Sequence, residues 1–456
     1  MFRCILMVLV LLSIPDAVQA QQGPGGGGGG GAGGGQLPGG ILIRADGLID
    51  RALAAPLPSS ASRVRRQLAE KNLSSELLTA SPRRTLSLRK LDEALAKHAA
   101  DATSLPVEIR YLAGLTRIDE VQIDGTGDLL ISGPGEAFAP GAGGRLTGLE
   151  SGRPVLCLED LLVALRTPEI LERCGCSIDP DPQRLAQSQM WLQQNSSPAT
   201  LQVAQARMEN MVRLMGRWNV TTFGVPEDSR MSLSMVEADY IMKRLAIGVD
   251  RAPVGGLRST LQLAKPGDNM MRRWWFAAAP GYLTCTADKQ TWVLTGPRFQ
   301  LLAQEELLAS DGTLIDSDHA KGSSEEFARL FNDRREELAK KVSAFADLQN
   351  LFDVLVVAAI FQEVVQSDSD SPRWVPQVLT SPDVFPPVRY PVPRETQPLL
   401  TTRQAPAGPL IGAFSGGVVF ASRELLRGTM AVPGSASQPP VVIPEGDWWT
   451  QAERVR

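Results

Sequence analysis

The chain has 456 residues, of which 43% are hydrophobic and 21% charged, and its formal net charge is −4. This composition is typical of a globular protein of about two or three domains, and it excludes a collagen-like or wholly disordered chain. The charge balance argues against nucleic acid as a partner, because nucleic-acid-binding proteins usually carry a basic excess.

The first 20 residues have the layout of a secretory signal peptide. Arg3 precedes an apolar run over 5–12, and Val18 and Ala20 are small residues at the −3 and −1 positions of a cleavage site. The run is far shorter than the ~20 residues that cross a bilayer, so it does not predict a retained anchor. We expect an exported protein, periplasmic or secreted, whose mature chain has no transmembrane segment.

Composition also divides the rest of the chain. Residues 21–40 are mostly glycine and predict a disordered, flexible linker, because they bury too little apolar area to offset the entropy of ordering. We expect residues 41–366 to form an α+β globular region, either single or divided into two subdomains near residue 150 or 265. Residues 367–456 are rich in proline and predict an extended strap with a C-terminal strand or tail.

The first clear elements are a hairpin and a strand that leads into a helix. Two β-rich runs, 117–123 and 128–132, enclose the turn "DGTG" and predict the hairpin. Asp124 and Asp128 flank this turn, but they lack the spacing of a calcium-binding EF-hand loop, and turns favour Asp in any case. The sequence "VLCLEDLLVALR" then predicts a strand followed by a short helix.

Removal of the signal peptide leaves four cysteines: Cys157, Cys174, Cys176 and Cys285. Pro168 predicts a helix start and Gly175 a helix end, so Cys174 is expected at a helix C-terminus. That position disfavours a nucleophile because it raises a thiol pKa, and Cys-x-Cys is not the usual zinc spacing. Export favours a structural disulfide from Cys174 or Cys176 to Cys157 or Cys285, with small buried thiols as the alternative.

Three helices are predicted between residues 182 and 248. Helices over 182–195 and 197–218 precede a β-branched run, and a third helix begins at the cap Ser229 and ends at Gly248. The third helix has one apolar stripe that we assign to the core: Met231, Met235, Ala238, Met242 and Leu245. Asp239 and Lys243 have the spacing of a helix ion pair, and Glu237 points away from both.

The segment 272–308 predicts three or four strands, and two helices follow from Ser324. Four aromatic residues are expected to share one antiparallel sheet, either as core or as a stacking platform for sugars or peptides: Trp274, Trp275, Tyr282 and Trp292. The most apolar helical piece, 351–361, contains Asp353 and is too short to span a membrane, which predicts a buried core helix.

Two polar segments are candidates for function. The loop "DGTLIDSDHAKG" contains Asp311, Asp316, Asp318 and His319, which suit a divalent ion or a general base but are also ordinary in a turn. The stretch 63–97 is basic and includes Arg65, Arg66, Arg83 and Arg84. These arginines could bind an anionic polymer or a membrane surface. The alternative is that they form an ordinary solvated helix face.

Several motifs occur in order along the chain: "RYLAGLTRIDEV", "GDLLISGPGEAF", "GRPVLCLEDLLVALR", "CSIDPDPQRL", "SRMSLSMVEADYIMKRLAIG" and "FADLQNLFDVLVVAAIF". Together they resemble the family of secreted planctomycete proteins catalogued as domain of unknown function 1598. The similarity extends from about residue 41 to about residue 422. It implies an exported protein and supplies no activity, cofactor or catalytic residue.

The sequence contains no recognised nucleophile, P-loop, dinucleotide or metalloprotease motif, so we expect no cofactor and no metal site. The fold class that these elements favour is α+β, with antiparallel sheets packed with helices. We expect a non-catalytic interaction or structural module of the cell envelope, whose partner is an anionic envelope polymer or another envelope protein. Two alternatives stay open: a hydrolase that uses carboxylates such as Glu237 and Asp239, and an extracytoplasmic ligand-binding or sensing domain.

Overall fold

The computed structural model describes residues 41–43, 48–51, 61–141, 145–195, 201–264, 271–308, 314–317, 322–366, 374–398, 400–405, 408–433 and 435–452. The signal peptide and the glycine-rich linker predicted for residues 1–40 lie outside this part of the chain, so both stay predictions.

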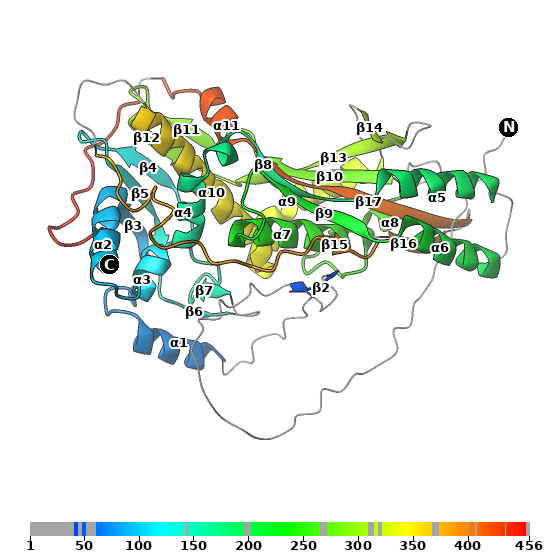
Figure 1. Ribbon diagram of the computed structural model, residues 1–456, viewed down its shortest axis with the longest axis horizontal. Helices are drawn as coiled ribbons and strands as arrows, with labels where there is room; N and C mark the ends of the chain where they lie inside the picture. Colours follow the sequence, from blue (N-terminus) through cyan, green and yellow to red (C-terminus); the bar gives the residue numbers. More distant parts are fainter. Residues whose placement is uncertain are drawn as a thin grey trace, which may run out of the picture.

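The protein has the predicted α+β fold, with helices packed between and around two main sheets (Figure 1). The larger sheet has ten strands: β1 (Ile41–Ile43), β2 (Leu48–Arg51), β8 (Cys174–Asp179), β9 (Trp218–Phe223), β10 (Met271–Ala278), β13 (Phe299–Leu308), β14 (Leu314–Ser317), β15 (Glu395–Thr396), β16 (Leu400–Ala405) and β17 (Gly408–Phe420). Their order is β1-β2-β15-β9-β8-β17-β10-β13-β14, and β16 also pairs with β17. Neighbours are antiparallel except β15 beside β2 and β17 beside β10.

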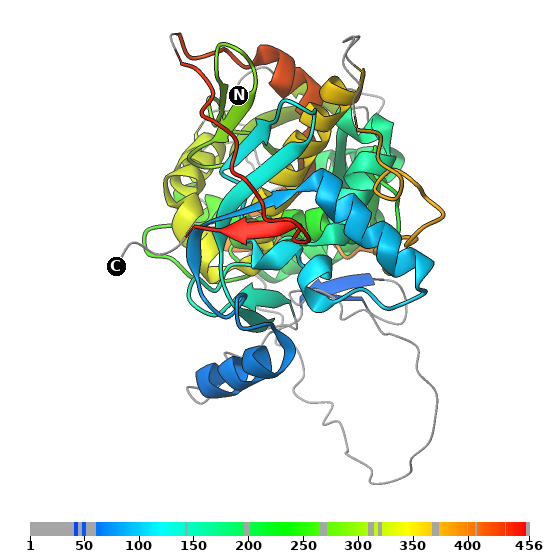
Figure 2. The same ribbon diagram turned by 90° about the vertical axis from the view of Figure 1, so that its left-hand side faces the viewer.

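A six-stranded antiparallel sheet occupies the other end of the molecule (Figures 1 and 2). Its strands are β3 (Ser81–Ser87), β4 (Glu120–Ile123), β5 (Leu129–Gly135), β11 (Leu283–Cys285), β12 (Thr291–Leu294) and β18 (Trp449–Gln451), in the order β11-β12-β4-β5-β3-β18. Strands β4 and β5 form the predicted hairpin, with Val121 opposite Ile131. A separate pair joins β6 (Phe138–Pro140) to β7 (Leu146–Gly148).

The helices are α1 (Ala61–Asn72), α2 (Leu88–Ala100), α3 (Val107–Arg110), α4 (Leu158–Arg166), α5 (Pro182–Gln194), α6 (Leu201–Met215), α7 (Arg230–Ile247), α8 (Thr260–Leu263), α9 (Ser323–Lys341), α10 (Ser343–Gln366) and α11 (Ser422–Gly428). Two 3₁₀ turns are η1 (Leu112–Gly114) and η3 (Pro168–Leu171). Helix α10 runs through the middle of the molecule and contacts α4, α7, α9 and α11 (Figure 1).

Helix α10 is the core helix that the sequence predicts. Among the described residues, Ser343–Glu363 is the one helical stretch long and apolar enough to cross a membrane by length and composition, and it is wholly buried inside the fold. A helix that is apolar on all sides must be enclosed, and the sheets and helices around α10 enclose it. Phe352, for example, lies 4.1 Å from Phe420 of β17, measured between ring centroids.

Helix α7 begins and ends where the sequence predicts. The Ser229 hydroxyl accepts a hydrogen bond from the Ser232 N–H, and Gly248 adopts the left-handed conformation with φ of 75°. All of its residues except Arg244 are buried, so the helix is enclosed on every side and not only along its methionine stripe. The charged residues of α7 therefore need partners inside the protein.

The prediction of a helix through Cys174 is wrong. The chain makes only the short η3 turn and then enters β8, which lies between β9 and β17 in the larger sheet. Gly175 is required for close approach and not as a helix stop, because a Cβ there would lie 1.8 Å from the Val418 carbonyl oxygen. The hydrogen bonds available to a central strand outweigh the local helix signals.

The four aromatic residues do not share one sheet. Trp274 and Trp275 lie in β10 of the larger sheet, whereas Trp292 lies in β12 of the smaller sheet and Tyr282 precedes β11. The turn after β10 carries the chain from one sheet to the other. Trp274 is fully buried, and the Trp275 indole N–H donates to Gln304 while the Arg273 guanidinium lies 4.7 Å from its ring centre. These side chains pack and pair within the protein and form no open stacking platform.

Residues 374–394, which we call the strap, form an irregular proline-rich segment between α10 and β15. The chain then returns to the core, because β17 forms a central strand of the larger sheet and β18 adds an edge to the smaller one. The strap is therefore an internal connection between two parts of the core.

Candidate functional site

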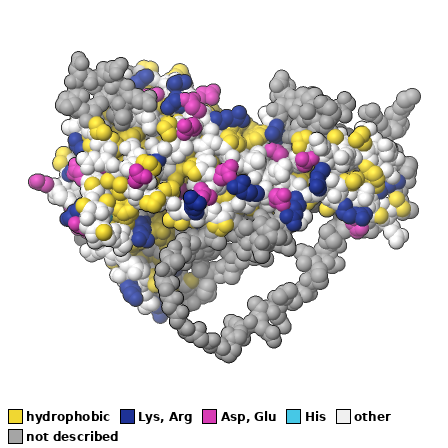
Figure 3. All heavy atoms as spheres, viewed as in Figure 1, with side chains coloured by type: hydrophobic (Ala, Val, Ile, Leu, Met, Phe, Trp, Pro, Cys, Tyr) yellow, Lys and Arg dark blue, Asp and Glu magenta, His cyan; other side chains and the backbone are white. Residues whose placement is uncertain are grey.

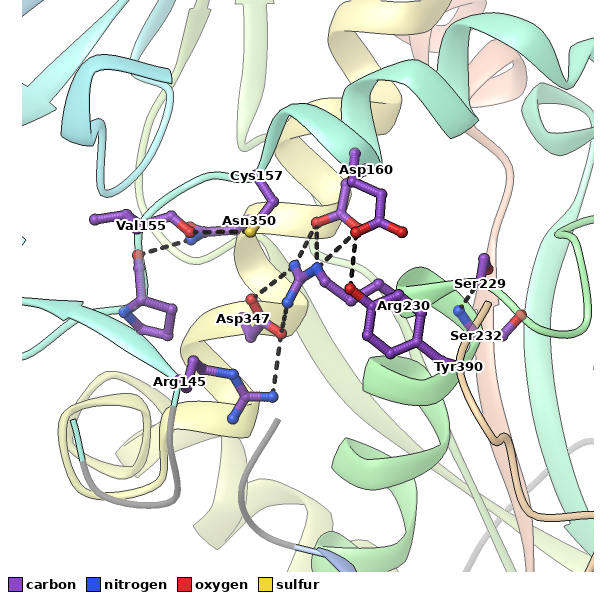
Figure 4. Close-up of polar contacts among 12 residues, drawn as sticks. Arg145, Val155, Cys157, Asp160, Ser229, Arg230, Ser232, Asp347, Asn350 and Tyr390 are labelled. Carbon is purple, nitrogen blue, oxygen red and sulfur yellow. Dashed lines mark hydrogen bonds and ion pairs between the residues drawn. The ribbon is translucent and has the colours of Figure 1, made fainter. Parts of the chain in front are cut away.

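A cluster of charged side chains lies where α4, α7 and α10 meet (Figure 4). We call it the three-helix cluster, and its members are Arg145, Asp160, Arg230, Glu237 and Asp347. Arg145 comes from the loop before β7, and each helix supplies at least one of the others. The exposed fractions of these side chains lie between 1% and 9%, so solvent has almost no access to them.

Arg230 connects α4 to α10. Its Nε donates to both carboxylate oxygens of Asp160 at 3.0 Å, and its Nη1 and Nη2 donate to the two oxygens of Asp347 at 3.1 Å. Arg230 is the first residue of α7, so both carboxylates also lie near the positive end of that helix dipole. Two-point pairing of this kind fixes the orientation of the groups as well as their separation.

Arg145 completes the cluster from the opposite side. Its Nη2 lies 2.8 Å from Glu237 Oε2 and 3.2 Å from Asp347 Oδ2, and its Nη1 donates to the Ser343 hydroxyl. Glu237 thus has a specific partner 92 residues earlier in the chain. The orientation predicted for Glu237, away from Asp239 and Lys243, is consistent with this contact.

Burial and pairing oppose each other in the cluster. Burial acts to raise the pKa of Asp347, but the guanidiniums of Arg230 and Arg145 together hold that pKa below its ordinary value. Burial raises the pKa of Asp160, although the Arg230 guanidinium acts to lower it. Burial likewise raises the pKa of Glu237, although the Arg145 guanidinium acts to lower it. Asp347, which faces both arginines, is therefore the carboxylate most firmly held in its charged form.

Asp239 and Lys243 form the predicted helix ion pair, but in the interior and not on the surface. Both side chains are 0% exposed, and the Lys243 ammonium also donates to the Gly416 carbonyl at 2.9 Å. Burial raises the pKa of Asp239 to about 7 in spite of Lys243. Glu237 and Asp239 have separate partners on different sides of α7, so the structure does not bring them together as a catalytic pair.

Asp353 interrupts the apolar surface of α10 and ties that helix to the segments just before β4 and β13. It accepts the Ile118 N–H at 3.0 Å and the Arg298 Nε–H at 2.6 Å, and Arg298 also donates to the Ile118 carbonyl. Side chains of Asp353 and Arg298 are 0% and 5% exposed. This buried pair joins two layers of the fold.

The cysteines do not form the predicted disulfide. Cys157, Cys174, Cys176 and Cys285 are all free thiols. Cys174 and Cys176 lie two residues apart in β8 of the larger sheet. Cys285 lies in the smaller sheet, and Cys157 precedes α4. Burial raises the pKa of Cys157 and of Cys174 to about 12, which makes both thiols poor nucleophiles.

The basic stretch does not form one charged face. Arg84 is 1% exposed and donates to the carbonyls of Ala113 and Leu77, and burial lowers its pKa to about 10. Arg83 pairs with Glu120. Arg65 points inward and donates to carbonyls of the β6–β7 pair, including Thr147 at 2.8 Å.

Three exposed cations of the stretch lie on α1, and Lys97 on α2 is exposed as well. The three on α1 are Arg63, Arg66 and Lys71, and α1 projects from the main body in Figure 2. On the face drawn in Figure 3, by contrast, basic and acidic side chains are interspersed.

The acidic turn candidates are occupied by hydrogen bonds. Asp124 Oδ1 accepts the N–H groups of Thr126 and Asp128, and Asp128 in turn accepts the Ser87 hydroxyl and the Arg89 N–H. Within the described part of the chain there is no group of three or more side chains placed to hold a metal ion. Of the second acidic loop, Asp311, Asp318 and His319 lie outside the described residues, and Asp316 lies in β14 opposite Glu306.

Charged side chains also hold the strap. The Asp92 carboxylate of α2 accepts the backbone N–H groups of Gln377, Val378 and Leu379. The Arg166 guanidinium of α4 donates to the backbone carbonyls of Val378, Leu379, Val384 and Phe385. Glu159 accepts the Val388 N–H at 3.1 Å and the Tyr390 hydroxyl at 2.8 Å. Tyr390 lies beside the three-helix cluster (Figure 4).

Sequence reasoning did not identify the three-helix cluster. One signal was available in the sequence. Arg230 and Glu237 are seven residues apart and therefore share a face of α7. The helix thus has a charged stripe in addition to its apolar stripe. The partners Asp160, Asp347 and Arg145 gave no such signal, because each lies on a separate element.

The geometry gives these charges a structural use. Four buried carboxylates each contact an arginine from another part of the chain: Asp160, Glu237, Asp347 and Asp353. Asp239 pairs with Lys243 of its own helix. A carboxylate-based catalyst needs two acids at an accessible bond, and those in the three-helix cluster are enclosed.

A family model described as protein of unknown function (DUF1598) matches residues 176–260, from β8 to the first residue of α8. The matched segment contains α7 with Arg230, Glu237, Asp239 and Lys243, whereas Arg145, Asp160 and Asp347 lie outside it. Neither the curated proteins nor the solved structures contain a match. The similarity found is to a family whose description states no activity.

Proposed function

We propose that the protein is an exported, non-catalytic interaction or structural module of the cell envelope. The observation that carries this proposal is the enclosure of the charged core, in which five carboxylates are buried and paired with cations: Asp160, Glu237, Asp239, Asp347 and Asp353. Such pairs hold helices in a fixed arrangement, whereas a hydrolase needs acids that reach a substrate. The signal-peptide layout of residues 1–20 supports export.

The surface that best fits an anionic partner is the outer face of α1. Arg65 and the buried Ala69 anchor this helix on the β6–β7 pair, which leaves Arg63, Arg66 and Lys71 exposed. An anchored helix with three outward cations attracts a polyanion without a large ordering cost on binding. An anionic envelope polymer is therefore the partner that we favour over another envelope protein.

The test is co-sedimentation of the mature protein with insoluble anionic envelope polymer. We expect binding that weakens as salt is raised, since exposed charges are screened over ~8 Å at physiological ionic strength. The triple variant R63Q/R66Q/K71Q should bind about tenfold more weakly or worse. A matched control, K340Q/K341Q/R427Q, removes three exposed cations elsewhere and should bind as the unmodified protein does.

Two outcomes would contradict the proposal. Equal binding by the α1 variant and the control would exclude α1 as the contact surface. Release of soluble polymer fragments, abolished by E237Q or D239N in a protein that still unfolds cooperatively, would establish a hydrolase.

A further inference from the structure

The last part of the chain crosses the smaller sheet before it ends in β18 (Figure 2). Cys285 of the edge strand β11 forms a bridge with Ala431, and the Ser87 N–H of β3 donates to the Trp448 carbonyl. We call the described residues between these contacts, 431–433 and 435–448, the C-terminal arm. They contain no helix and no strand, so the arm depends on contacts with the sheet for its position.

The first anchor of the arm is polar. The Asp288 carboxylate, in the turn between β11 and β12, accepts the Ser437 N–H at 3.2 Å and the Ser437 hydroxyl at 2.9 Å. The Gln122 side-chain amide of β4 donates to the next carbonyl along the arm, that of Gln438. Two strands of the sheet therefore hold the arm at residues 437 and 438.

The second anchor combines a cation with an apolar contact. The Lys90 ammonium of α2 donates to the carbonyls of Ile443 and Pro444 at 2.9 and 2.8 Å. The Ile443 side chain points inward and is only 8% exposed. Residues 439–442 thus form a short span that is fixed to the body of the protein at both ends.

Apolar side chains of this span face the solvent. Val442 is 86% exposed, and the prolines at 439, 440 and 444 are exposed as well. We call this set the proline ridge: Pro439, Pro440, Val442 and Pro444. Single exposed apolar side chains are ordinary on a protein surface, but these four lie within six consecutive residues of one anchored segment.

The sequence also restricts the ridge to an extended conformation. Proline fixes its own φ at about −65°, and a residue that precedes a proline avoids the helical region. Gln438, Pro439 and Ile443 all precede prolines, so the segment 438–444 favours the polyproline II conformation. Because both ends are bound to the protein, the ridge is ordered before a partner arrives, which lowers the entropy cost of binding.

We propose that the proline ridge is the docking site for a partner protein that has a groove lined by aromatic side chains and a basic rim. Such grooves bind exposed polyproline segments, because flat rings pack well against proline and other apolar side chains. The basic rim follows from Glu445 and Asp447, which are exposed directly after the ridge.

The ridge and α1 suit different partners. The carboxylates of Glu445 and Asp447 repel an anionic polymer, whereas the exposed cations of α1 attract one. The inference therefore goes beyond the polymer contact proposed above and does not depend on it.

The test is affinity capture from an envelope extract on the immobilised mature protein, followed by elution with poly-L-proline. Poly-L-proline has the conformation expected for the ridge and competes for an aromatic groove, so it should release the bound partner. A Gly-Ser polymer of the same length is the control and should release nothing. Capture alone does not support the proposal, and the absence of any protein released by poly-L-proline would overturn it.

Variants then locate the contact, with the Kd of the released protein as the readout. V442D places a charge inside the groove and should weaken binding about tenfold or more. P439A/P440A keeps small apolar side chains but loosens the extended conformation, and it should weaken binding roughly fivefold. M430S is the matched control, because Met430 is 83% exposed but lies outside the ridge, and it should bind as the unmodified protein does.

Three outcomes would contradict the proposal or separate it from the function of α1. Equal binding by V442D and M430S would exclude the ridge as the contact. A dimer of the unmodified protein in sedimentation that V442D abolishes would make a second copy the occupant, and the proposal of a different partner protein would be wrong. V442D should still co-sediment with anionic polymer, and R63Q/R66Q/K71Q should still bind the released protein, so a failure on one surface leaves the other proposal intact.

Discussion

Arg230 and Arg329 each contact two carboxylates, but they do so in different regions of the molecule. Arg230 lies among α4, α7 and α10 with 9% of its side chain exposed, and Arg329 lies on α9 with 57% exposed. Water replaces a lost partner at the surface, whereas in the interior nothing replaces it. The same residue type therefore holds the fold together in one region and is close to energetically neutral in the other.

Helix α1 shows the same contrast between adjacent residues. Arg65 turns inward and donates to carbonyls of the β6–β7 pair, whereas Arg66 is exposed. The basic stretch of the sequence thus contains structural arginines and free surface charges side by side. Removing all of them together would confuse loss of folding with loss of binding, which is why the binding variant above spares Arg65 and Arg84.

The strongest test of the contrast replaces each of the two arginines by methionine. R230M leaves Asp160 and Asp347 buried beside an apolar side chain, and the free energy of unfolding should fall by about 3–5 kcal/mol. R329M removes only exposed pairs and should cost less than about 1 kcal/mol. Urea unfolding followed by circular dichroism measures both, and equal losses would show that burial does not separate the two regions.

A smaller effect is expected on α1. R65A leaves carbonyl oxygens of β6 and β7 without their donor, and the free energy of unfolding should fall by about 1–3 kcal/mol. R66A changes an exposed side chain on the same helix and should stay within about 0.5 kcal/mol. If R66A proves the more damaging in the same urea experiment, the assignment of inward and outward faces on α1 is incorrect.

The smallest change is expected for the variant used to test binding. R63Q/R66Q/K71Q alters only exposed residues, so its unfolding free energy should match that of the unmodified protein to within about 0.5 kcal/mol. Thermal and urea unfolding both check this. A large loss of stability would mean that these cations support the fold, and a binding defect could then not be ascribed to contact.

Much of the secondary structure was predictable because its signals are local. Ser229 and Gly248 bound α7 as expected, the turn "DGTG" joins β4 to β5, and the apolar run in α10 is enclosed. Caps, turns and periodicity act over a few residues, so a single segment contains the information. The predictions that failed, the helix through Cys174 and the shared aromatic sheet, concern segments whose role depends on distant strands.

The sequence by itself determined the α+β class, the positions of most helices and the core helix. Only the tertiary structure decided which charges are buried and with what partners: Arg145 meets Glu237 across 92 residues, and Arg230 meets Asp347 across 117. Gly175 belongs to a strand because β17, from the far end of the chain, pairs with β8. The physical reason is that burial and pairing act between elements, and a linear pattern specifies each element but not its neighbours.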